Sequence, residues 1–252
     1  SMSDVILAAY HGGLGDNLQF STLPEEFHKQ QGRDTYIWSQ ASFRNQEIYD
    51  LVWGHNPYVK GIKDGEWSAG DTPNRHKTLL QNGIANWEVL HDLKPTNKYP
   101  KIYYKPEKID DFDNVILVDL SSISWAKRRT EAGISMVDEG KKILDAYESI
   151  KKKHEGKTFL GVEFTQKVSG TPLIDPDVTG IVEIESIFSY VDLIYSSFGV
   201  ISLHSGQSVL AASIKNDYNN DLEVYCIMDE DEYQDQKRRA IYVFDNVTYS
   251  RY

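Results

Sequence analysis

The 252-residue chain is short of cysteine and of basic side chains. It holds one cysteine, and its 27 Lys and Arg face 38 Asp and Glu, for a net charge of −11. A single cysteine excludes an intrachain disulfide, and Cys226, within the apolar run Val224–Met228, is predicted to be a buried thiol in a reducing compartment. The acidic balance argues against nucleic acid as a partner, because such binders present a basic face to phosphates. The acidic net charge is still compatible with a small basic pocket for one phosphate or pyrophosphate.

Long apolar runs and metal-ligand patterns are also lacking. No segment reaches the roughly 18 apolar residues of a membrane span, and Val5–Ala9 is too short and lacks the basic flank of a signal peptide. We therefore expect a cytoplasmic protein. No His/Cys cluster has ligand spacing and no Asp-x-Asp pair follows a strand, so no metal site is predicted. The acidic run Asp229–Glu232 is interpreted as a solvated loop.

Along the chain, segments with the pattern of strands alternate with segments with the pattern of helices. This alternation predicts an α/β fold with parallel sheets. In the first half we expect strands at Val5–Tyr10 and Thr35–Trp38, and helices at Leu18–Gln31, Asn45–Trp53 and Ile84–Leu93. Within Leu18–Gln31, either the regular helix starts near Pro24 or Pro24 kinks a helix that starts earlier. In the second half we expect strands at Val115–Leu120, Phe159–Phe164, Asp192–Tyr195, Val200–Leu203 and Glu223–Met228, and helices at Val137–His154, Ile181–Val191 and Gly206–Lys215. The proline-bearing stretch Lys94–Asp113 is the predicted linker. The predicted domains are residues 4–108 and 109–252.

A glycine-rich loop follows the first predicted strand. Gly13 and Gly15 allow close backbone approach to a ligand, although their spacing is not that of the dinucleotide fingerprint. Asp16 at the start of the next helix has two structural interpretations, helix cap or partner of the helix dipole. The functional interpretation is a general base at the strand's carboxyl edge, where open α/β sheets bind ligands.

A second informative segment runs from Ser196 to Lys215. A predicted strand enters a turn of small residues and then an alanine-rich helix. The amides of Gly206, Gln207 and Ser208, with the hydroxyls of Ser205 and Ser208, would form an anion site, or Ser205 would simply cap the helix. His204 is either a phosphate or sugar contact or a structural hydrogen-bonding residue.

Together these segments resemble the heptosyltransferase-like (family 9-like) glycosyltransferases of the GT-B class. The string from Gly15 to Pro24, which includes Asn17, resembles the family's Gly-Asp-x-Leu-x-x-x-Pro-type segment, and Ser205–Ala212 resembles its donor-phosphate motif. The sequence departs from that second motif, because His204 stands at the motif aspartate and Val209 at the motif histidine.

The resemblance implies two Rossmann-like domains facing a cleft, with the acceptor against the first and a nucleotide-diphosphate sugar in the second. Asp16 would deprotonate a hydroxyl of a saccharide acceptor in an inverting transfer without metal or cofactor. Residues 205–208, with Lys127 or Arg128, would stabilise the leaving diphosphate. Trp38, Phe43, Tyr49 and Trp53 would stack on the acceptor or pack in the core.

Two other functions fit the same residues. A nucleotide-sugar hydrolase or epimerase would use the same two domains, with water or the sugar itself in place of the acceptor. A non-catalytic protein that binds a nucleotide sugar or glycan would keep the binding residues without turnover. Stabilisation by nucleoside diphosphates and their sugars would separate ligand classes, because a specific ligand stabilises the folded state by mass action.

Overall fold

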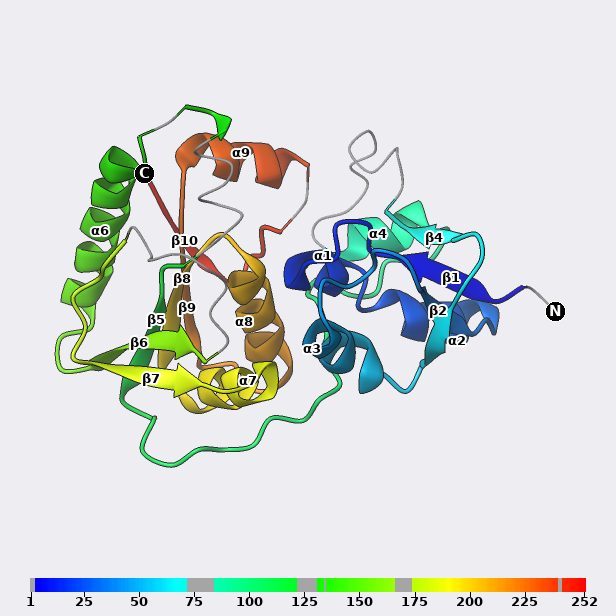
Figure 1. The fold of residues 1–252 in the computed structure, drawn as a ribbon, viewed down its shortest axis with the longest axis horizontal. Coiled ribbons are helices and arrows are strands. Elements are labelled where there is room, and N and C mark those ends of the chain that lie inside the picture. Colours follow the sequence, from blue (N-terminus) through cyan, green and yellow to red (C-terminus); the bar gives the residue numbers. More distant parts are fainter. Residues whose placement is uncertain (1–2, 72–83, 122–130, 134, 166–173, 240–241) are drawn as a thin grey trace. The chain divides into compact units, whose positions relative to one another are not determined.

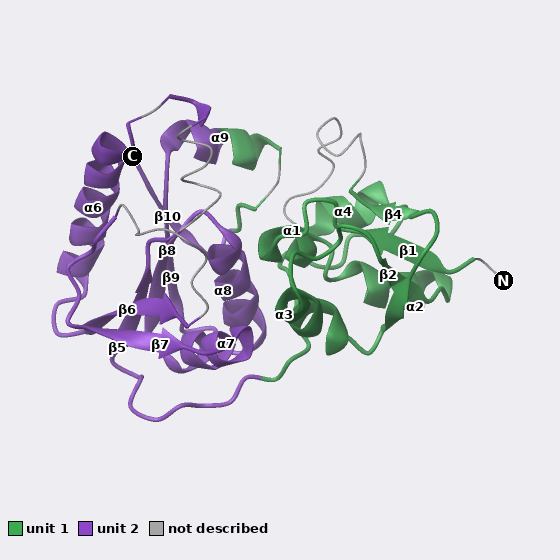
Figure 2. Cartoon of the chain, in the orientation of Figure 1, with its two compact units in different colours: residues 1–105, 235–244 green, residues 106–234, 245–252 purple. Residues whose placement is uncertain are grey.

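A computed structural model describes residues 3–71, 84–121, 131–133, 135–165, 174–239 and 242–252. The chain forms two compact units (Figure 2). Unit 1 contains Ser1–Lys105 and Asp235–Phe244, and unit 2 contains Pro106–Gln234 and Asp245–Tyr252. The sequence-based division placed every residue after 108 in the second domain, whereas Asp235–Phe244 groups with unit 1. Among the described residues, no helix is long and apolar enough to cross a membrane.

Unit 1 is built around a four-stranded parallel sheet with the strand order β3-β2-β1-β4 (Figure 1). Its elements are β1 (Val5–Ala8), α1 (Leu14–Gln19), α2 (Leu23–Gln31), β2 (Thr35–Trp38), α3 (Gln46–Tyr49), a π-helical turn η1 (Asp50–Gly54), β3 (Val59–Lys63), β4 (Ala69–Gly70) and α4 (Ile84–Leu90). Strand β1 is short and apolar, and Val5, Leu7 and Ala8 are fully buried. The predicted strand–helix rhythm and parallel sheet are confirmed here.

Unit 2 holds a six-stranded parallel sheet with the order β10-β9-β8-β5-β6-β7. Its elements are β5 (Val115–Asp119), α6 (Met136–Lys153), β6 (Thr158–Phe164), β7 (Gly180–Ile184), α7 (Ile187–Ser196), β8 (Gly199–Leu203), α8 (Gly206–Asp217), β9 (Glu223–Met228), α9 (Glu230–Arg238, whose last residues belong to unit 1) and β10 (Thr248–Arg251). Helix α6 covers one face of the sheet, and α7 and α8 cover the other (Figure 1).

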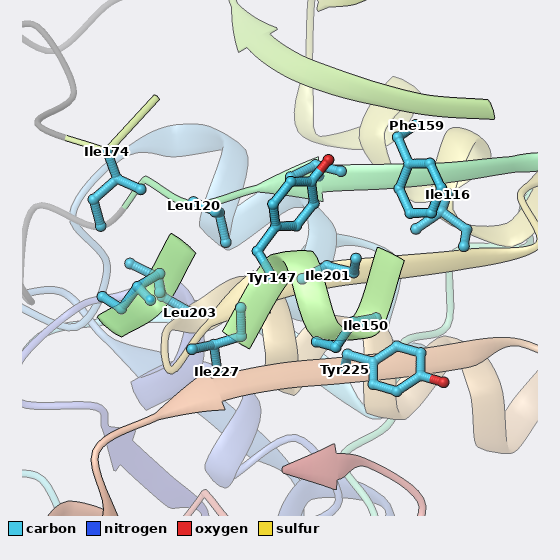
Figure 3. Packing of buried hydrophobic residues seen from close by; sticks show 12 residues of the cluster. Ile116, Leu120, Tyr147, Ile150, Phe159, Ile174, Ile201, Leu203, Tyr225 and Ile227 are labelled. Atoms are coloured by element: carbon cyan, nitrogen blue, oxygen red, sulfur yellow. The ribbon is translucent and has the colours of Figure 1, made fainter. Parts of the chain in front are cut away.

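The packing under α6 explains why the central strands of unit 2 are apolar. Ile143, Tyr147 and Ile150 recur along one face of α6 and pack on strand residues such as Ile116 and Ile201 (Figure 3). All five residues are at most 2 % exposed. Because both faces of the sheet are covered, β5 and β8 read as continuous apolar runs. The expected burial of Cys226 in β9 is confirmed.

For Leu18–Gln31, the alternative of a regular helix that starts near Pro24 is confirmed, since α2 begins at Leu23 with Pro24 in its first turn, and α1 ends before it at Gln19. Other predicted elements differ from the structure. The helix expected over Ile181–Val191 is confirmed only from Ile187 onward, and the strand expected over Asp192–Tyr195 is wrong because α7 continues to Ser196. Gly180–Ile184 is an edge strand, and the helix begins only after Ser186, whose hydroxyl accepts from the Ser189 amide. The acidic run Asp229–Glu232 starts helix α9 and is not a loop.

The predicted linker Lys94–Asp113 packs on both units along its length. In unit 1, fully buried Glu88 accepts hydrogen bonds from the Thr96 amide at 2.7 Å and the Asn97 amide at 3.0 Å, and Ile102 is fully buried. In unit 2, the Ile109 amide donates to the hydroxyl of Ser196 at 2.8 Å. The prolines therefore mark extended chain that is fixed to the two units by hydrogen bonds.

Candidate functional site

In unit 1 the strand order changes direction beside β1. The chain runs from β1 outward to β2 and β3, and then returns to the opposite side of β1 as β4. Ligands of open α/β sheets bind outside the carboxyl ends of the strands at such a switch point. The loop from Tyr10 to Gly13, between β1 and α1, lies at this edge of the sheet.

Two glycines give this loop its shape. Gly12 has a φ of +71°, and a Cβ added there would lie 3.1 Å from the carbonyl oxygen of Ala41 and 3.2 Å from the amide nitrogen of Arg44. A Cβ on Gly13 would lie 2.8 Å from Oδ2 of Asp16. The positive φ of Gly12 favours glycine there, and a side chain at Gly13 would displace the carboxylate of Asp16. Gly15 lies in the first turn of α1 and is half-buried.

Asp16 is half-buried, and each of its carboxylate oxygens accepts a hydrogen bond. Oδ2 accepts from the amide of Gly13 at 3.1 Å, and Oδ1 accepts from the hydroxyl of Tyr242 at 2.5 Å. Gly13 is the N-cap of α1 and Asp16 is in its first turn, so Asp16 stabilises the start of the helix through the Gly13 amide and the helix dipole and is not itself the cap. Each carboxylate oxygen has a second lone pair, which leaves capacity to accept a proton from a ligand. The interpretations of Asp16 as a partner of the helix dipole and as a general base are therefore both compatible with its geometry.

Tyr242 was not found by sequence reasoning. It belongs to the segment Asp235–Phe244, which groups with unit 1. In the chain this segment lies between strands β9 and β10 of unit 2. Its φ of +58° is unusual for a residue with a side chain. No local sequence signal points to it, because its partner Asp16 lies 226 residues earlier.

Asn17 is placed differently from the sequence prediction of a substrate contact. Its side chain is fully buried, with Nδ2 donating to the carbonyl oxygen of Gly13 at 2.8 Å and Oδ1 accepting from Nε1 of Trp53 at 2.7 Å. A side chain with both polar atoms engaged and no exposed surface is a structural support. Asn17 fixes the glycine loop that holds Asp16.

In unit 2 the strand order reverses between β5 and β8. Counted along the chain within this unit, the strand order is 3-2-1-4-5-6, which is the order of a dinucleotide-binding sheet. Strand β5 ends at Asp119, and β8 is followed directly by the first turn of α8 (Figure 1). The motif predicted to hold a phosphate therefore lies at the switch point of this sheet.

Residues 205–208 form the start of α8, but they use some of their polar groups internally. Ser205 occupies the cap position without a side-chain cap bond, and its hydroxyl donates to the carbonyl oxygen of Leu203 at 3.2 Å and to Oε1 of Gln207. The amide and the hydroxyl of Ser208 both donate to the carbonyl oxygen of Ser205, at 3.2 and 2.9 Å. The predicted contribution of Ser208 to an anion site is therefore reduced, and the first-turn amides of Gly206 and Gln207 are the groups left to supply it.

Asp119 is a further buried acid at this switch point. It is 2 % exposed and accepts from the hydroxyl of Ser121 at 2.7 Å and the hydroxyl of Tyr190 at 2.8 Å. Burial raises the pKa of its carboxyl, and hydrogen bonds from Ser121, Tyr190 and Gln207 oppose that rise. This network ties the end of β5 to the first turn of α8. The sequence signal for it is a single acidic residue within the apolar run Val115–Leu120, at the end of β5.

His204 lies between β8 and α8 and is largely buried. Its Nδ1 is 3.6 Å from Oε1 of Glu232, and the two side chains are 9 % and 16 % exposed. The two groups form an ion pair when the imidazole is protonated. This pairing supports the structural interpretation of His204. The predicted cations Lys127 and Arg128 lie outside the described residues.

Potential metal ligands do not cluster in the part of the chain that the structure describes. No group of three or more His, Cys, Asp or Glu side chains there is arranged to hold an ion.

Comparison with known proteins gives matches in structure only. No family model matches the sequence, and no curated protein matches it. Solved structures of glycosyltransferases match it at low identity. TibC, described as a dodecameric iron-containing heptosyltransferase in complex with ADP-D-beta-D-heptose, has a TM-score of 0.57 at 13 % identity, over 97 % of this chain and 62 % of that one. A second TibC structure, from enterotoxigenic Escherichia coli H10407, has a TM-score of 0.57 at 16 % identity, over 90 % and 59 %.

Two further structures match over most of their own length. The E. coli heptosyltransferase WaaC with ADP has a TM-score of 0.57 at 8 % identity, over 99 % of this chain and 93 % of that one. A family 9 glycosyltransferase from Veillonella parvula DSM 2008 has a TM-score of 0.54 at 8 % identity, over 99 % and 85 %. This chain spans about three fifths of TibC and most of WaaC. The chain therefore has the fold of the heptosyltransferase-like glycosyltransferases, as its two short motifs predicted.

Proposed function

We propose that this protein is a metal-independent, inverting glycosyltransferase of GT-B type. It would move a sugar from a nucleoside-diphosphate sugar to a hydroxyl of a saccharide acceptor. Unit 2 would bind the donor and unit 1 the acceptor. Such a reaction requires the two units to bring donor and acceptor together.

The observation that carries the proposal is that each sheet has the required group at its switch point. In unit 1 this is the carboxylate of Asp16, held by the Gly13 amide and the Tyr242 hydroxyl. In unit 2 it is the start of α8, a 12-residue helix with no acidic residue in its first turn. A carboxylate can accept a proton, and a helix N-terminus favours a diphosphate. The shared fold with heptosyltransferases supports this pairing of roles.

The proposed chemical step is a single displacement at the anomeric carbon. The acceptor oxygen attacks that carbon from the face opposite the diphosphate, and its proton passes to the carboxylate of Asp16. The bond between the anomeric carbon and the diphosphate oxygen breaks, and the electron pair leaves with the nucleoside diphosphate. The products are an inverted glycoside and a protonated carboxyl, which returns its proton to solvent.

Charge develops on the diphosphate as this bond breaks. The amides of Gly206 and Gln207 and the positive end of the α8 dipole would stabilise that charge, because they are oriented before the reaction. Asp119 would act as a positioning residue, since its carboxyl bonds to Gln207 in the same turn. Lys127 and Arg128 belong to the segment after β5 and would add positive charge there.

The test is turnover of nucleotide sugars by the Asp16→Asn variant. The purified chain would be incubated with ADP-heptose and with ADP-, UDP- and GDP-hexoses, with and without a mixture of oligosaccharide acceptors and with EDTA throughout. We expect nucleoside diphosphate release that needs an acceptor, and a loss of about 100-fold or more in Asp16→Asn with nucleotide affinity unchanged. Asp92→Asn is the matched control, because Asp92 has a φ of +61°, which asparagine tolerates.

Each other outcome has a distinct meaning. Full turnover by Asp16→Asn would remove this residue from the mechanism. Release of free sugar and nucleotide without any acceptor would instead identify a hydrolase. Nucleotide-sugar binding without turnover by the wild-type chain would identify a binding protein.

A further inference from the structure

Three aromatic side chains of unit 1 form a cluster at the surface. The ring of Tyr10 lies 6.0 Å from that of Trp38 and 6.1 Å from that of Trp67, measured between centroids. Tyr10 is 52 % exposed, and the two tryptophans are half-buried. Large aromatic side chains usually lie in the core, so a cluster of three that reaches the surface through an exposed Tyr10 is unusual. We call these residues the aromatic platform.

The fold places the aromatic platform at the edge of the sheet that carries the candidate base. Tyr10 lies two residues beyond β1 and six residues before Asp16, and Trp38 is the last residue of β2. Strands β1 and β2 are parallel, with Leu7 opposite Ile37, so their carboxyl ends lie together. The platform therefore lies at the switch-point edge of unit 1.

Trp38 and Trp67 are held in place by the segment before β4. The Nε1 of Trp38 donates to the carbonyl oxygen of Gly65 at 2.8 Å. The amide of Ser68, next to Trp67, donates to the carbonyl oxygen of Ile6 in β1 at 2.8 Å. The indole of Trp38 and the backbone beside Trp67 are thus held on the sheet before any ligand binds, which lowers the entropic cost of binding.

The acidic residues near the platform in the chain favour an uncharged, hydroxyl-rich ligand. His11, next to Tyr10, has its Nε2 3.8 Å from Oδ2 of Asp71, and the two side chains are 64 % and 13 % exposed. Asp64 and Glu66 are exposed in the segment that leads to Trp67. Carboxylates accept hydrogen bonds from hydroxyl groups and repel anions. A sugar ring offers both apolar C–H faces for the aromatic rings and hydroxyls for the carboxylates.

We propose that Tyr10, Trp38 and Trp67 form a stacking subsite for an uncharged sugar unit of the saccharide acceptor. The proposal rests on the proposed glycosyltransferase function and adds the class of acceptor. It also revises the aromatic residues that the sequence suggested, because Trp53 is 1 % exposed and Phe43 packs on Tyr49 at 5.0 Å. Of those four, Trp38 is a member of the platform.

The test measures binding of neutral hexasaccharides to the full chain. Maltohexaose, cellohexaose, mannohexaose and chitohexaose would be titrated by saturation-transfer difference NMR, with a polygalacturonate hexamer as the anionic comparison. We expect at least one neutral probe to bind, and Tyr10→Ala to weaken it by roughly 3- to 10-fold. Tyr58→Ala is the matched control, since Tyr58 is a half-buried aromatic of unit 1 outside the platform. Trp67→Phe provides a second, conservative variant with a smaller loss.

Several results would overturn the subsite. They are failure of every neutral probe to bind, equal binding by Tyr10→Ala and wild type, and tighter binding of the anionic hexamer. A dimer in sedimentation equilibrium that Tyr10→Ala dissociates would assign the platform to contact between copies of the chain. Calorimetry with nucleoside diphosphates, run on the same samples, separates the two proposals. If the wild-type chain binds nucleoside diphosphates but Tyr10→Ala leaves saccharide binding unchanged, only the subsite is refuted. If the wild-type chain binds no nucleoside diphosphate, the proposed function is refuted.

Discussion

The start of α8 allows a prediction in which stability and ligand affinity change in opposite directions. Gly206 is the first residue of this helix, and no acidic residue lies in the first turn. The substitution Gly206→Asp adds a negative charge at the positive end of the helix dipole. That charge should stabilise the free protein by about 0.3–1 kcal/mol, because it interacts favourably with the unpaired first-turn amides. The same charge should repel a bound diphosphate.

The size of that repulsion follows from Coulomb's law. A carboxylate about 5 Å from one phosphate charge costs about 0.8 kcal/mol at the dielectric constant of water and about 3 kcal/mol at an effective value near 20. Nucleoside diphosphate affinity should therefore fall by roughly 4- to 200-fold. Gly206→Asn is the matched control, since it has nearly the same shape without the charge.

The assay combines calorimetric titration of ADP, UDP and GDP with thermal unfolding of the same samples. Gly206→Asp should melt at or above the temperature of Gly206→Asn and bind the nucleotide more weakly, with the difference shrinking as salt is raised. Nucleotide affinity equal to that of the wild type in both variants would refute the placement of the diphosphate at this helix. An equal loss of affinity in both variants would show that side-chain volume, and not charge, decides binding there.

Two other predictions concern unit 1. Asn17→Leu should lower the free energy of unfolding by about 2–3 kcal/mol, because it leaves the buried indole N–H of Trp53 without its acceptor. Urea unfolding of Asn17→Leu, of Trp53→Phe and of the double variant would measure this. Losses that simply add in the double variant would contradict the role of this hydrogen bond. Burial lowers the pKa of His91 below its usual 6.5, and the imidazole accepts a hydrogen bond from the Gly70 amide. The folded state therefore favours the neutral form of His91. Its contribution to stability is therefore complete above about pH 6.5 and is lost as the pH falls, by up to about 1.4 kcal/mol per pH unit for one proton; urea unfolding between pH 5 and 8 should show a slope that His91→Gln removes.

The sequence predicted the elements whose signal is local and strong. Thr35–Trp38 and Glu223–Met228 are strands with the predicted limits, and α6 lies within one residue of its predicted range. The prediction failed at β7 and α7. Ile181 and Ile184 suit a helix or an edge strand equally, and only pairing with β6 selects the strand. Strands β3 and β10 were missed because neither includes a fully buried side chain, and β4 was missed because it has only two residues.

By itself the sequence determined the chemistry that two loops can support. The glycines around Asp16 and the small residues from Ser205 to Ser208 act through backbone geometry within a few positions, so their pattern is legible without a fold. The α/β class follows from the alternation of strand and helix patterns along the chain, and the likeness to heptosyltransferases follows from these two segments. The structural matches agree with both.

Only the tertiary structure decided which side chains gather around those loops. It brings Tyr242 to Asp16 across 226 residues, buries Asn17 against Trp53, and assembles Tyr10, Trp38 and Trp67 from three separate segments. Contacts at such separations depend on strand order and on which face of a sheet is covered. Those are properties of the packed chain as a whole, and no local pattern encodes them.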